Sequence, residues 1–392
     1  MNKKKINVAI FWDRMGGTTE AKLAGMEVRH LNQIGVNTDL LLIERQIPDK
    51  YRKLLCDIKI YCLEDYIPKI LRANFKIPGF SFFSLSHMTS PLYSPLVFRR
   101  KYDIIVSHGT FTCLTARNLR KYRGLPYLAH IWDPMSYILQ KVYVDTFLSH
   151  FQKFLVPIGT RVDKFILKEA EAIILPAKYH MDLVKRLTER PIEIVYPAVN
   201  STSEIPVKRG NYILAVMKRW EEMKKPLFLL DLLERLKKKG IKAPLIMVGS
   251  WKTQRTYEDF VREAKRRNVL KQIELKGEVV SNEELSRYYF GARVLIHPIS
   301  VSGFGMTALE AAAHGTPIIF PKDSGVTDLF VHGVHGFFPK QGDLDSFVEY
   351  SEILLFDERK AWKMGFDAWQ VAKEYTWLRH TKRLHEVIEK YI

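Results

Sequence analysis

The apolar residues of this 392-residue chain alternate between short runs typical of buried strands and longer runs with helical spacing. In the first half, residues 6–11 predict a strand, and the helix that follows is expected to end at Gly35. The same rhythm restarts at residues 211–217 and continues to about residue 320. Strands that alternate with helices at this spacing predict parallel sheets. The sequence therefore predicts an α/β protein.

Two such series predict two Rossmann-like, doubly wound domains. The length of the chain agrees, because a domain usually has about 150 residues. The break falls in a polar, Pro-containing stretch at residues 196–202. We therefore expect a first domain over residues 1–200 and a second domain from residue 201 onward.

The chain is strongly basic. It has 61 Lys and Arg residues against 43 Asp and Glu residues, a formal net charge of +18. Residues 1–200 hold 30 basic and 18 acidic residues, a net charge of +12, which leaves +6 for the remainder. Such an excess predicts an anionic partner, which could be nucleic acid, a phosphorylated small molecule or an acidic membrane surface.

The three cysteines, Cys56, Cys62 and Cys113, cannot form a closed disulfide framework, and none has the spacing of a metal ligand. This usage predicts a reducing, cytoplasmic environment. The apolar run at residues 6–12 is too short for a signal-peptide core. No segment offers the roughly 20 uninterrupted apolar residues of a spanning helix, so we expect none.

Residues 77–98 contain no Asp, Glu, Lys or Arg but many aromatic and aliphatic residues, and Arg99, Arg100 and Lys101 follow directly. An uncharged, Pro-broken segment closed by a basic cluster suits a loop that enters a lipid interface. An insertion that covers the core of its own domain explains the composition equally well.

A second aromatic face has helical spacing and comprises Tyr143, Phe147, Phe151 and Phe154. Here the pattern favours packing in the core.

The strongest local signal is the segment SGFGMTALEAAAHGTP at residues 302–317. It follows a predicted strand and opens a helix, and we expect no large side chain to obstruct the first turn near its two glycines. Such a turn lets backbone N–H groups approach an anion, and the helix dipole favours a phosphate there. Glu310, one turn further on, could accept hydrogen bonds from sugar hydroxyls. A turn built only for tight packing would have a similar composition.

This segment resembles the C-terminal signature of glycosyltransferase family 4, the glycosyl transferases group 1, which are two-domain enzymes of the GT-B fold. The resemblance extends over nearly the whole chain. It implies two Rossmann-like domains that face a cleft: an acceptor-binding domain at 1–200, a domain at 201–372 that binds a nucleotide-sugar, and C-terminal helices at 373–392 that pack back on the first domain.

The resemblance also implies roles for individual residues. Arg219 and Lys224 resemble the pair that holds the donor diphosphate, and His130 resembles the histidine near the donor sugar. A guanidinium fork and an ammonium suit two phosphoryl groups, although a solvated charged face would also explain this pair. The donor-binding positions implied are Gly16, Gly17, Gly249, Gly277, Val279, Ser302, Gly303, Phe304, Gly305, Met306, Thr307 and Glu310.

The implied activity is retaining transfer of a sugar from a nucleotide-sugar to a hydroxyl by a front-face mechanism, with neither a metal nor another cofactor. For the acceptor we expect a lipid-linked molecule or a glycan, at the cytoplasmic face of an anionic membrane, because the basic first domain contains the apolar segment 77–98.

The chain departs from the family pattern at Ser302, where a glutamate that contacts the donor sugar is usual, and at Lys218, where a glycine is usual. An unusual sugar, or a catalytically silent scaffold, would follow from the first departure. A nucleic-acid-binding protein is a further alternative, but the chain lacks a recognised reader motif, so we expect no nucleic-acid partner. The pair Asp343 and Asp345 could bind a metal–nucleotide complex but fits a helix N-cap better.

Overall fold

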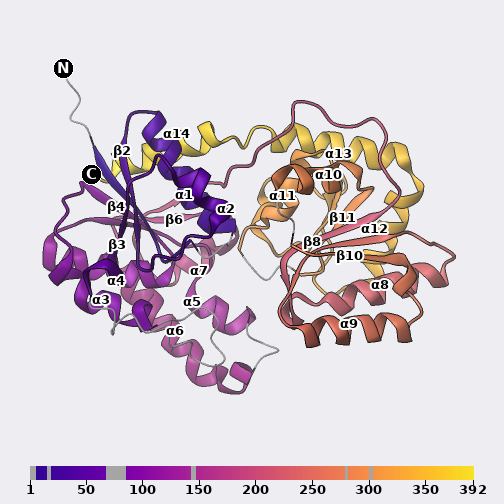
Figure 1. Cartoon of the computed structure of the whole chain (residues 1–392), viewed down its shortest axis with the longest axis horizontal. Coiled ribbons are helices and arrows are strands. Elements are labelled where there is room, and N and C mark those ends of the chain that lie inside the picture. The colour runs from indigo at the N-terminus through magenta and orange to yellow at the C-terminus, as the bar shows by residue number, and fades with distance from the viewer. Residues whose placement is uncertain (1–5, 16–18, 68–84, 143–146, 279–280, 300–302) are drawn as a thin grey trace. The chain divides into compact units, whose positions relative to one another are not determined.

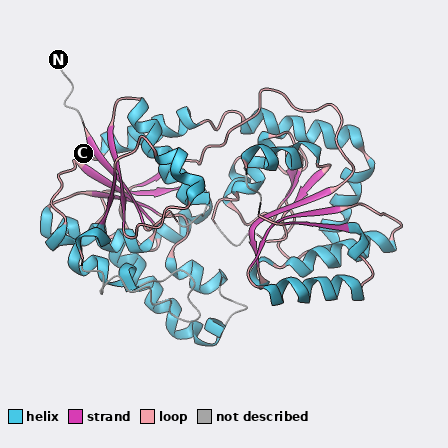
Figure 2. Ribbon diagram, in the orientation of Figure 1, coloured by secondary structure: helices cyan, strands magenta, loops and turns pink. Residues whose placement is uncertain are grey.

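A computed structural model of the chain describes residues 6–15, 19–67, 85–142, 147–278, 281–299 and 303–392. The chain divides into two compact units, Met1–Pro197 with Trp377–Ile392, and Ala198–Thr376. Each unit contains one parallel sheet with helices on both faces (Figures 1 and 2). The predicted fold class, two doubly wound α/β sheets, is confirmed.

The sheet of the first unit has seven strands. They are β1 (Asn7–Trp12), β2 (Asn37–Leu42), β3 (Ile60–Cys62), β4 (Ile104–His108), β5 (Tyr127–His130), β6 (Ile173–Leu175) and β7 (Ile192–Ile194). Their order in space is β3-β2-β1-β4-β5-β6-β7, and every described pair is parallel. The chain reverses its direction across the sheet between β1 and β4, and such switch points are where open α/β sheets bind ligands.

Helices cover both faces of this sheet (Figure 1). They are α1 (Thr19–Gln33), α2 (Asp49–Leu55), α3 (Leu85–Val97), α4 (Thr110–Arg123), α5 (Met135–Tyr137), α6 (Gln152–Leu167), α7 (Met181–Lys185) and α14 (Trp377–Lys390). The side chains of α1, α2 and α14 share one core with Val8 and Ile10 of β1, and those of α4 and α6 share another with Ala9 and Phe11. Because alternate strand residues point to opposite faces and both faces are covered, β1 is apolar from Val8 to Trp12.

The last helix, α14, is held to the first unit by polar contacts as well as by its apolar face. The imidazole of His380 donates a hydrogen bond from Nδ1 to the Tyr196 carbonyl (2.7 Å) and lies 3.1 Å from a carboxylate oxygen of Glu27 through Nε2. Arg383 and Lys390 pair with Glu193 of β7 at 2.6 and 2.7 Å. The C-terminal helix is therefore a structural part of the first unit.

The sheet of the second unit has six strands. They are β8 (Ile213–Trp220), β9 (Leu245–Trp251), β10 (Ile273–Lys276), β11 (Val294–Ile296), β12 (Ile318–Ile319) and β13 (Gly336–Phe337). Their order is β10-β9-β8-β11-β12-β13, again with parallel pairs throughout. The switch point lies between β8 and β11, so the carboxyl ends of these two strands are where a ligand is expected.

Helices also cover the sheet of the second unit, and several of them begin at a cap that the sequence offers. They are α8 (Pro226–Lys238), α9 (Gln254–Arg266), α10 (Asn282–Gly291), α11 (Met306–Ala313), α12 (Leu344–Phe356) and α13 (Glu358–Ala372). Pro226 occupies the first turn of α8, and Thr253 and Thr256 form a capping box on α9. The side chain of Asp343 accepts a hydrogen bond from the Ser346 N–H and so caps α12, as its position predicts.

Within the described residues, no helix combines the length and the apolar character that crossing a membrane requires.

The packing of α14 gives a direct test of its structural role. Leu384 is fully buried in the core, whereas Leu378 of the same helix is 54% exposed. We expect Leu384→Ala to lower the free energy of unfolding by about 2–5 kcal/mol, because it leaves a cavity. The matched change Leu378→Ala should cost no more than about 0.5 kcal/mol. Urea denaturation followed by circular dichroism measures both, and equal losses would show that α14 does not pack as described.

Candidate functional site

The carboxyl ends of β8, β9 and β10 carry three of the predicted donor-site residues. Arg219 lies near the end of β8, after an irregularity in the ladder between Val216 and Arg219. Gly249 lies near the end of β9 and has φ +135, and a Cβ there would be 1.9 Å from the Met217 carbonyl oxygen. Gly277 directly follows β10 and has open space around its Cα. These strand ends share one edge of the sheet, because all the strands run parallel.

Arg219 is only loosely paired. Its guanidinium Nη2 lies 3.8 Å from an oxygen of Glu221, and its Nε has no hydrogen-bond partner among the described residues. The other oxygen of Glu221 lies 3.4 Å from the ammonium of Lys252. One carboxylate is thus shared between two cations, which leaves positive charge at the end of β8 for an additional anion.

Lys224 adds a second cation near the switch point. It ends a short 3-10 helix, Glu222–Lys224, that follows β8, and its charge acts on His297 directly after β11. Burial and then this ammonium lower the pKa of His297 to about 3, against its usual value of 6.5. The imidazole stacks on Phe320 with ring centroids 4.6 Å apart. His297 is therefore neutral at physiological pH. The sequence analysis missed it, although its place after an apolar strand is a usable signal.

The glycine turn before α11 presents backbone donors at the same edge. Gly303 and Gly305 have φ values of +43 and +95, which disfavour residues with a Cβ. Gly305 is the N-cap of α11, and no side chain caps the helix there. The first N–H groups of a helix, here from Met306 and Thr307, have no partner within the helix. They are therefore suited to binding an anion.

The rest of this turn is fixed by packing. Phe304 is buried, and its carbonyl accepts a hydrogen bond from the Val326 N–H at 2.6 Å. The carbonyl of Gly303 accepts one from the Gly325 N–H at 2.9 Å. A Cβ on Gly305 would approach Phe320 to 3.0 Å. Both the conformation and the space at Gly305 thus require a glycine.

Glu310 lies one turn into α11, partly buried. One oxygen of its carboxylate accepts a hydrogen bond from the Tyr289 hydroxyl at 3.0 Å. Burial, followed by the charge of this carboxylate, raises the pKa of Tyr289 well above its usual value, so the phenol stays protonated as a donor. Tyr289 therefore fixes the orientation of the Glu310 carboxylate.

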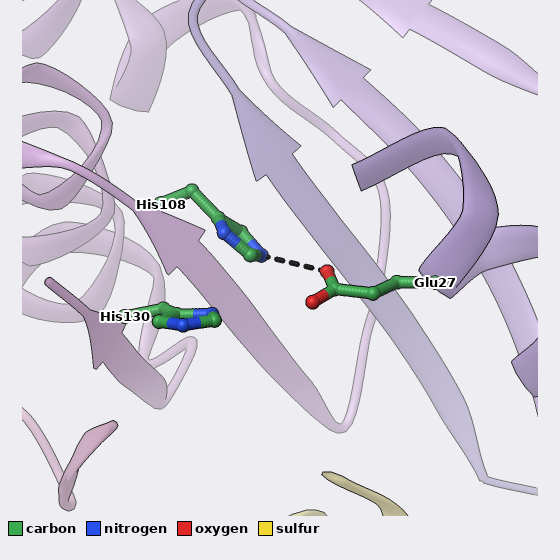
Figure 3. Close-up of side chains that lie close together, drawn as sticks. All are labelled: Glu27, His108 and His130. Carbon is green, nitrogen blue, oxygen red and sulfur yellow. Dashed lines mark ion pairs between the residues drawn. The ribbon is translucent and has the colours of Figure 1, made fainter. Parts of the chain in front are cut away.

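The first unit contains a separate, fully buried polar cluster of Glu27 on α1, His108 at the end of β4 and His130 at the end of β5 (Figure 3). His108 Nε2 lies 2.9 Å from Glu27 Oε2, in an ion-pair contact without the angles of a hydrogen bond. The rings of His108 and His130 are 4.3 Å apart between centroids. The strands bring the two histidines together because their positions are opposite one another in the ladder.

Electrostatics distinguish the members of this cluster. Burial alone would raise the pKa of Glu27, but His108 and His380 hold it well below its usual value, so Glu27 is ionised. Burial, and then His108, lower the pKa of His130 well below 6.5. Neither ring nitrogen of His130 has a hydrogen-bond partner in the described part of the chain. The neutral imidazole of His130 therefore lies beside the ring of His108 and near the ionised carboxylate of Glu27.

This cluster is the one group of possible metal ligands found among the described residues. The donor atoms of Glu27, His108 and His130 all lie within 4.8 Å of one another. Two imidazoles and a carboxylate are a ligand set that Zn²⁺ accepts. However, the Glu27 carboxylate already contacts both His108 and His380. Its charge is thus compensated by side chains, and we assign no metal to the cluster.

The structure places most of the predicted residues at these two sites. Arg219, Lys224, Gly249, Gly277, residues 303–307 and Glu310 belong to the second unit, and His130 belongs to the first. Four predicted donor-binding positions, Gly16, Gly17, Val279 and Ser302, lie outside the described residues.

A family model and several known proteins are similar to this chain. The family model described as "Glycosyl transferases group 1" matches residues 201–368. An uncharacterized glycosyltransferase of Methanocaldococcus jannaschii is 23% identical over 304 residues, which are 70% of this chain and 83% of that protein.

Two solved structures share the fold of nearly the whole chain. Sucrose-phosphate synthase from Thermosynechococcus elongatus superposes with a TM-score of 0.77 at 16% identity, covering 98% of this chain and 99% of that one. The Anabaena protein HepE, in complex with UDP and glucose, gives a TM-score of 0.72 at 15% identity, covering 98% of this chain and 100% of that one. Both similarities establish the two-domain GT-B fold.

The environment of His297 predicts how stability depends on pH. An unfolded chain protonates this histidine below its usual pKa near 6.5, whereas the folded protein resists protonation until about pH 3. Its contribution to stability is therefore complete above pH 6.5 and is lost as the pH falls below that value. Between pH 6.5 and pH 5 the loss should reach up to about 1.5 kcal/mol.

His297→Gln should remove this part of the pH dependence. Urea unfolding of the wild type and the variant at pH 7.5, 6.5 and 5 measures it as the difference between the two curves. His385→Gln, on the outer side of α14, is the control and should leave the wild-type slope unchanged. A slope for His297→Gln equal to that of the wild type would contradict a neutral, partly buried His297.

Proposed function

We propose that this chain is a retaining, metal-independent glycosyltransferase. The premise is that it belongs to the glycosyl transferases group 1 family of nucleotide-sugar-dependent enzymes. The donor would bind to the second unit, at the carboxyl ends of β8 and β11. The acceptor would be a hydroxyl of a lipid-linked molecule or a glycan, bound by the first unit.

One observation carries this proposal: two cations and the uncapped start of a helix lie at the switch point of the second sheet. Transfer of a sugar leaves a nucleoside diphosphate, and without a metal its charge must be met by fixed groups. The loosely paired guanidinium of Arg219 and the ammonium of Lys224 supply full charges. Gly305 leaves the N–H groups of Met306 and Thr307 exposed toward an anion.

Glu310, oriented by Tyr289, is suited to accept hydrogen bonds from the hydroxyls of the nucleotide ribose. Gly249 and Gly277 let the strand ends approach the nucleotide closely, since neither has a side chain in the way.

The reaction we propose is a front-face displacement at the anomeric carbon. The bond between this carbon and the diphosphate oxygen breaks, and the acceptor hydroxyl forms a new bond on the same face. The hydroxyl proton passes to the departing diphosphate, so no enzymatic nucleophile is required. Arg219, Lys224 and the start of α11 would stabilise the charge that develops on the diphosphate.

His130 would act on the donor sugar as a neutral hydrogen-bonding group. Its low pKa makes proton uptake unfavourable, and its side chain is only 1% exposed. Glu27 and His108 would act as positioning residues, since they fix the surroundings of this ring.

The acceptor is proposed from charge and composition. The first 200 residues carry a net charge of +12 and include the uncharged segment 77–98. Both features support a lipid-linked acceptor at the cytoplasmic face of an anionic membrane, where each basic side chain adds about 1 kcal/mol of attraction.

The phosphate assignment predicts a specific loss of activity. Arg219→Ala and Lys224→Ala should each lower kcat/KM for sugar transfer about 10²–10³-fold, as removal of one transition-state donor does in other enzymes. Arg255→Ala is the control, because Arg255 is 90% exposed and pairs only loosely with Asp259. Steady-state kinetics after a thermal-shift screen of UDP-, GDP-, ADP- and TDP-sugars measures the effect.

Two results would argue against the proposal. Wild-type turnover in the Arg219/Lys224 double variant would exclude these cations from the diphosphate site. A wild-type protein that binds nucleotide-sugars but neither transfers nor hydrolyses them would instead be a silent member of the family.

A further inference from the structure

Helix α6 has an exposed face that is apolar along one edge and basic along the other. Phe151, Phe154, Ile158 and Phe165 recur at intervals of three, four and seven residues, so they share one side of the helix. All four are exposed, and Phe154 is exposed to 72%. The opposite side of α6 contributes Ile166 and Leu167 to the core of the first unit. The helix is thus apolar on two sides, only one of which is buried.

This exposure overturns the expectation that the aromatic face at Phe151 and Phe154 packs in the core. The sequence pattern correctly indicated an apolar helical face but could not tell which of two apolar sides is buried. In the structure, the core-facing side is formed by Gly159, Asp163 and Ile166. Of the other residues in that predicted face, Tyr143 lies outside the described residues.

The charges on the exposed side of α6 have a single sign. Lys153, Arg161, Lys164 and Lys168 are all exposed beside the apolar edge. The two carboxylates of this segment are engaged elsewhere: Asp163 is buried and accepts hydrogen bonds from the backbone of Met135 and Ser136, and Glu169 pairs with Arg117. A solvated surface helix normally mixes both signs, so this face is unusual.

Helix α3 repeats the arrangement. Met88, Leu92 and Leu96 recur every four residues and are exposed, Leu92 to 73%. Arg99, Arg100 and Lys101 follow the helix and are also exposed. Both α3 and α6 pack against α4, on the same face of the first sheet (Figure 1). The first unit thus carries two helices that both contact α4, each with an exposed apolar stripe and adjacent cations.

We propose that this surface, the exposed sides of α6 and α3, docks the first unit onto an anionic lipid bilayer. The inference deepens the proposed function and rests on it for the choice of a lipid-linked acceptor. Phe151, Phe154 and Ile158 would enter the boundary between headgroups and acyl chains, and the lysines and arginines beside them would contact lipid phosphates. Arg117 supports this orientation, because it stacks 3.6 Å above the Phe165 ring and keeps it at the surface.

Charge complementarity selects a bilayer over a second copy of this chain. An interface between two copies would bring the basic edges of two α6 helices together, with no exposed carboxylate from these segments to pair them. An anionic leaflet supplies negative charge at high density and accepts apolar side chains directly beneath it. We therefore expect the partner of this surface to be a lipid bilayer, and the experiment below would also detect self-association of the protein.

The full-length protein is tested by co-sedimentation with vesicles of phosphatidylcholine, alone or with about 30% phosphatidylglycerol. We expect binding to the anionic vesicles, weakened by salt, and at least tenfold weaker binding for the double variant Phe154→Ser/Ile158→Ser. Replacing Lys153 and Lys164 by alanine should weaken it about 25-fold, since each cation contributes roughly fivefold. Phe356→Ser in the second unit, where Phe356 is 70% exposed, is the matched control and should bind like the wild type.

Three outcomes would overturn the docking surface: no binding of the wild type, an equal loss in the Phe356→Ser control, or an α6-dependent dimer in sedimentation velocity without vesicle binding. The thermal midpoint of unfolding checks that each variant is folded. We expect it to be unchanged, because the replaced side chains are exposed. Nucleotide-sugar binding is measured in the same samples. Vesicle binding without nucleotide-sugar binding would contradict the proposed transferase function but not the proposed docking surface.

Discussion

The parallel direction of every described strand pair is the constraint on which the rest of this protein depends. A parallel strand can be reached only through a crossover, so helices must cover both faces, and the strands must be apolar on both sides. The same constraint sends all carboxyl ends to one edge of each sheet. At that edge in the second unit lie Arg219 of β8, Gly249 of β9 and the turn at Gly305 before α11, which is why we propose one site there. The chemistry is therefore a consequence of strand direction.

Within the first unit, the ionised carboxylate of Glu27 joins parts of the chain that are far apart in sequence. It contacts His108 at the end of β4 and His380 on α14, and His380 in turn binds the Tyr196 carbonyl. A buried carboxylate is costly unless it is compensated, and removing one partner of such a pair costs more than the pair itself contributes. Through His380, the C-terminal helix α14 thus helps to fix Glu27 and His108, which surround His130.

The sequence was sufficient for the fold class and for the glycine turn that precedes α11. Alternating periodicity identified both sheets, and the glycines at 303 and 305 have the positive φ values that a tight, anion-accepting turn requires. It was insufficient where the outcome depends on tertiary contacts. Glu27 carries no local signal on α1, because its partners come from β4 and α14. His297 gains its low pKa from burial and from Lys224, neither of which local spacing reveals. The sequence could not show which of the two apolar sides of α6 is buried, because this depends on which side packs toward the sheet.

The net charge of +18 is best understood as two separate uses of positive charge. At the switch point of the second sheet the cations are few, and Arg219 lies near the carboxylate of Glu221. This arrangement suits a small ligand that must bind and then dissociate. On α6 and α3 they are exposed, are not shared with carboxylates of their own segments, and lie beside apolar stripes. A diphosphate does not need an apolar surface, and a nucleic acid would not be expected to meet aliphatic side chains such as Leu92 and Ile158. An anionic lipid surface would use both, so the partner that we propose accounts for the composition of these helices as well as for their charge.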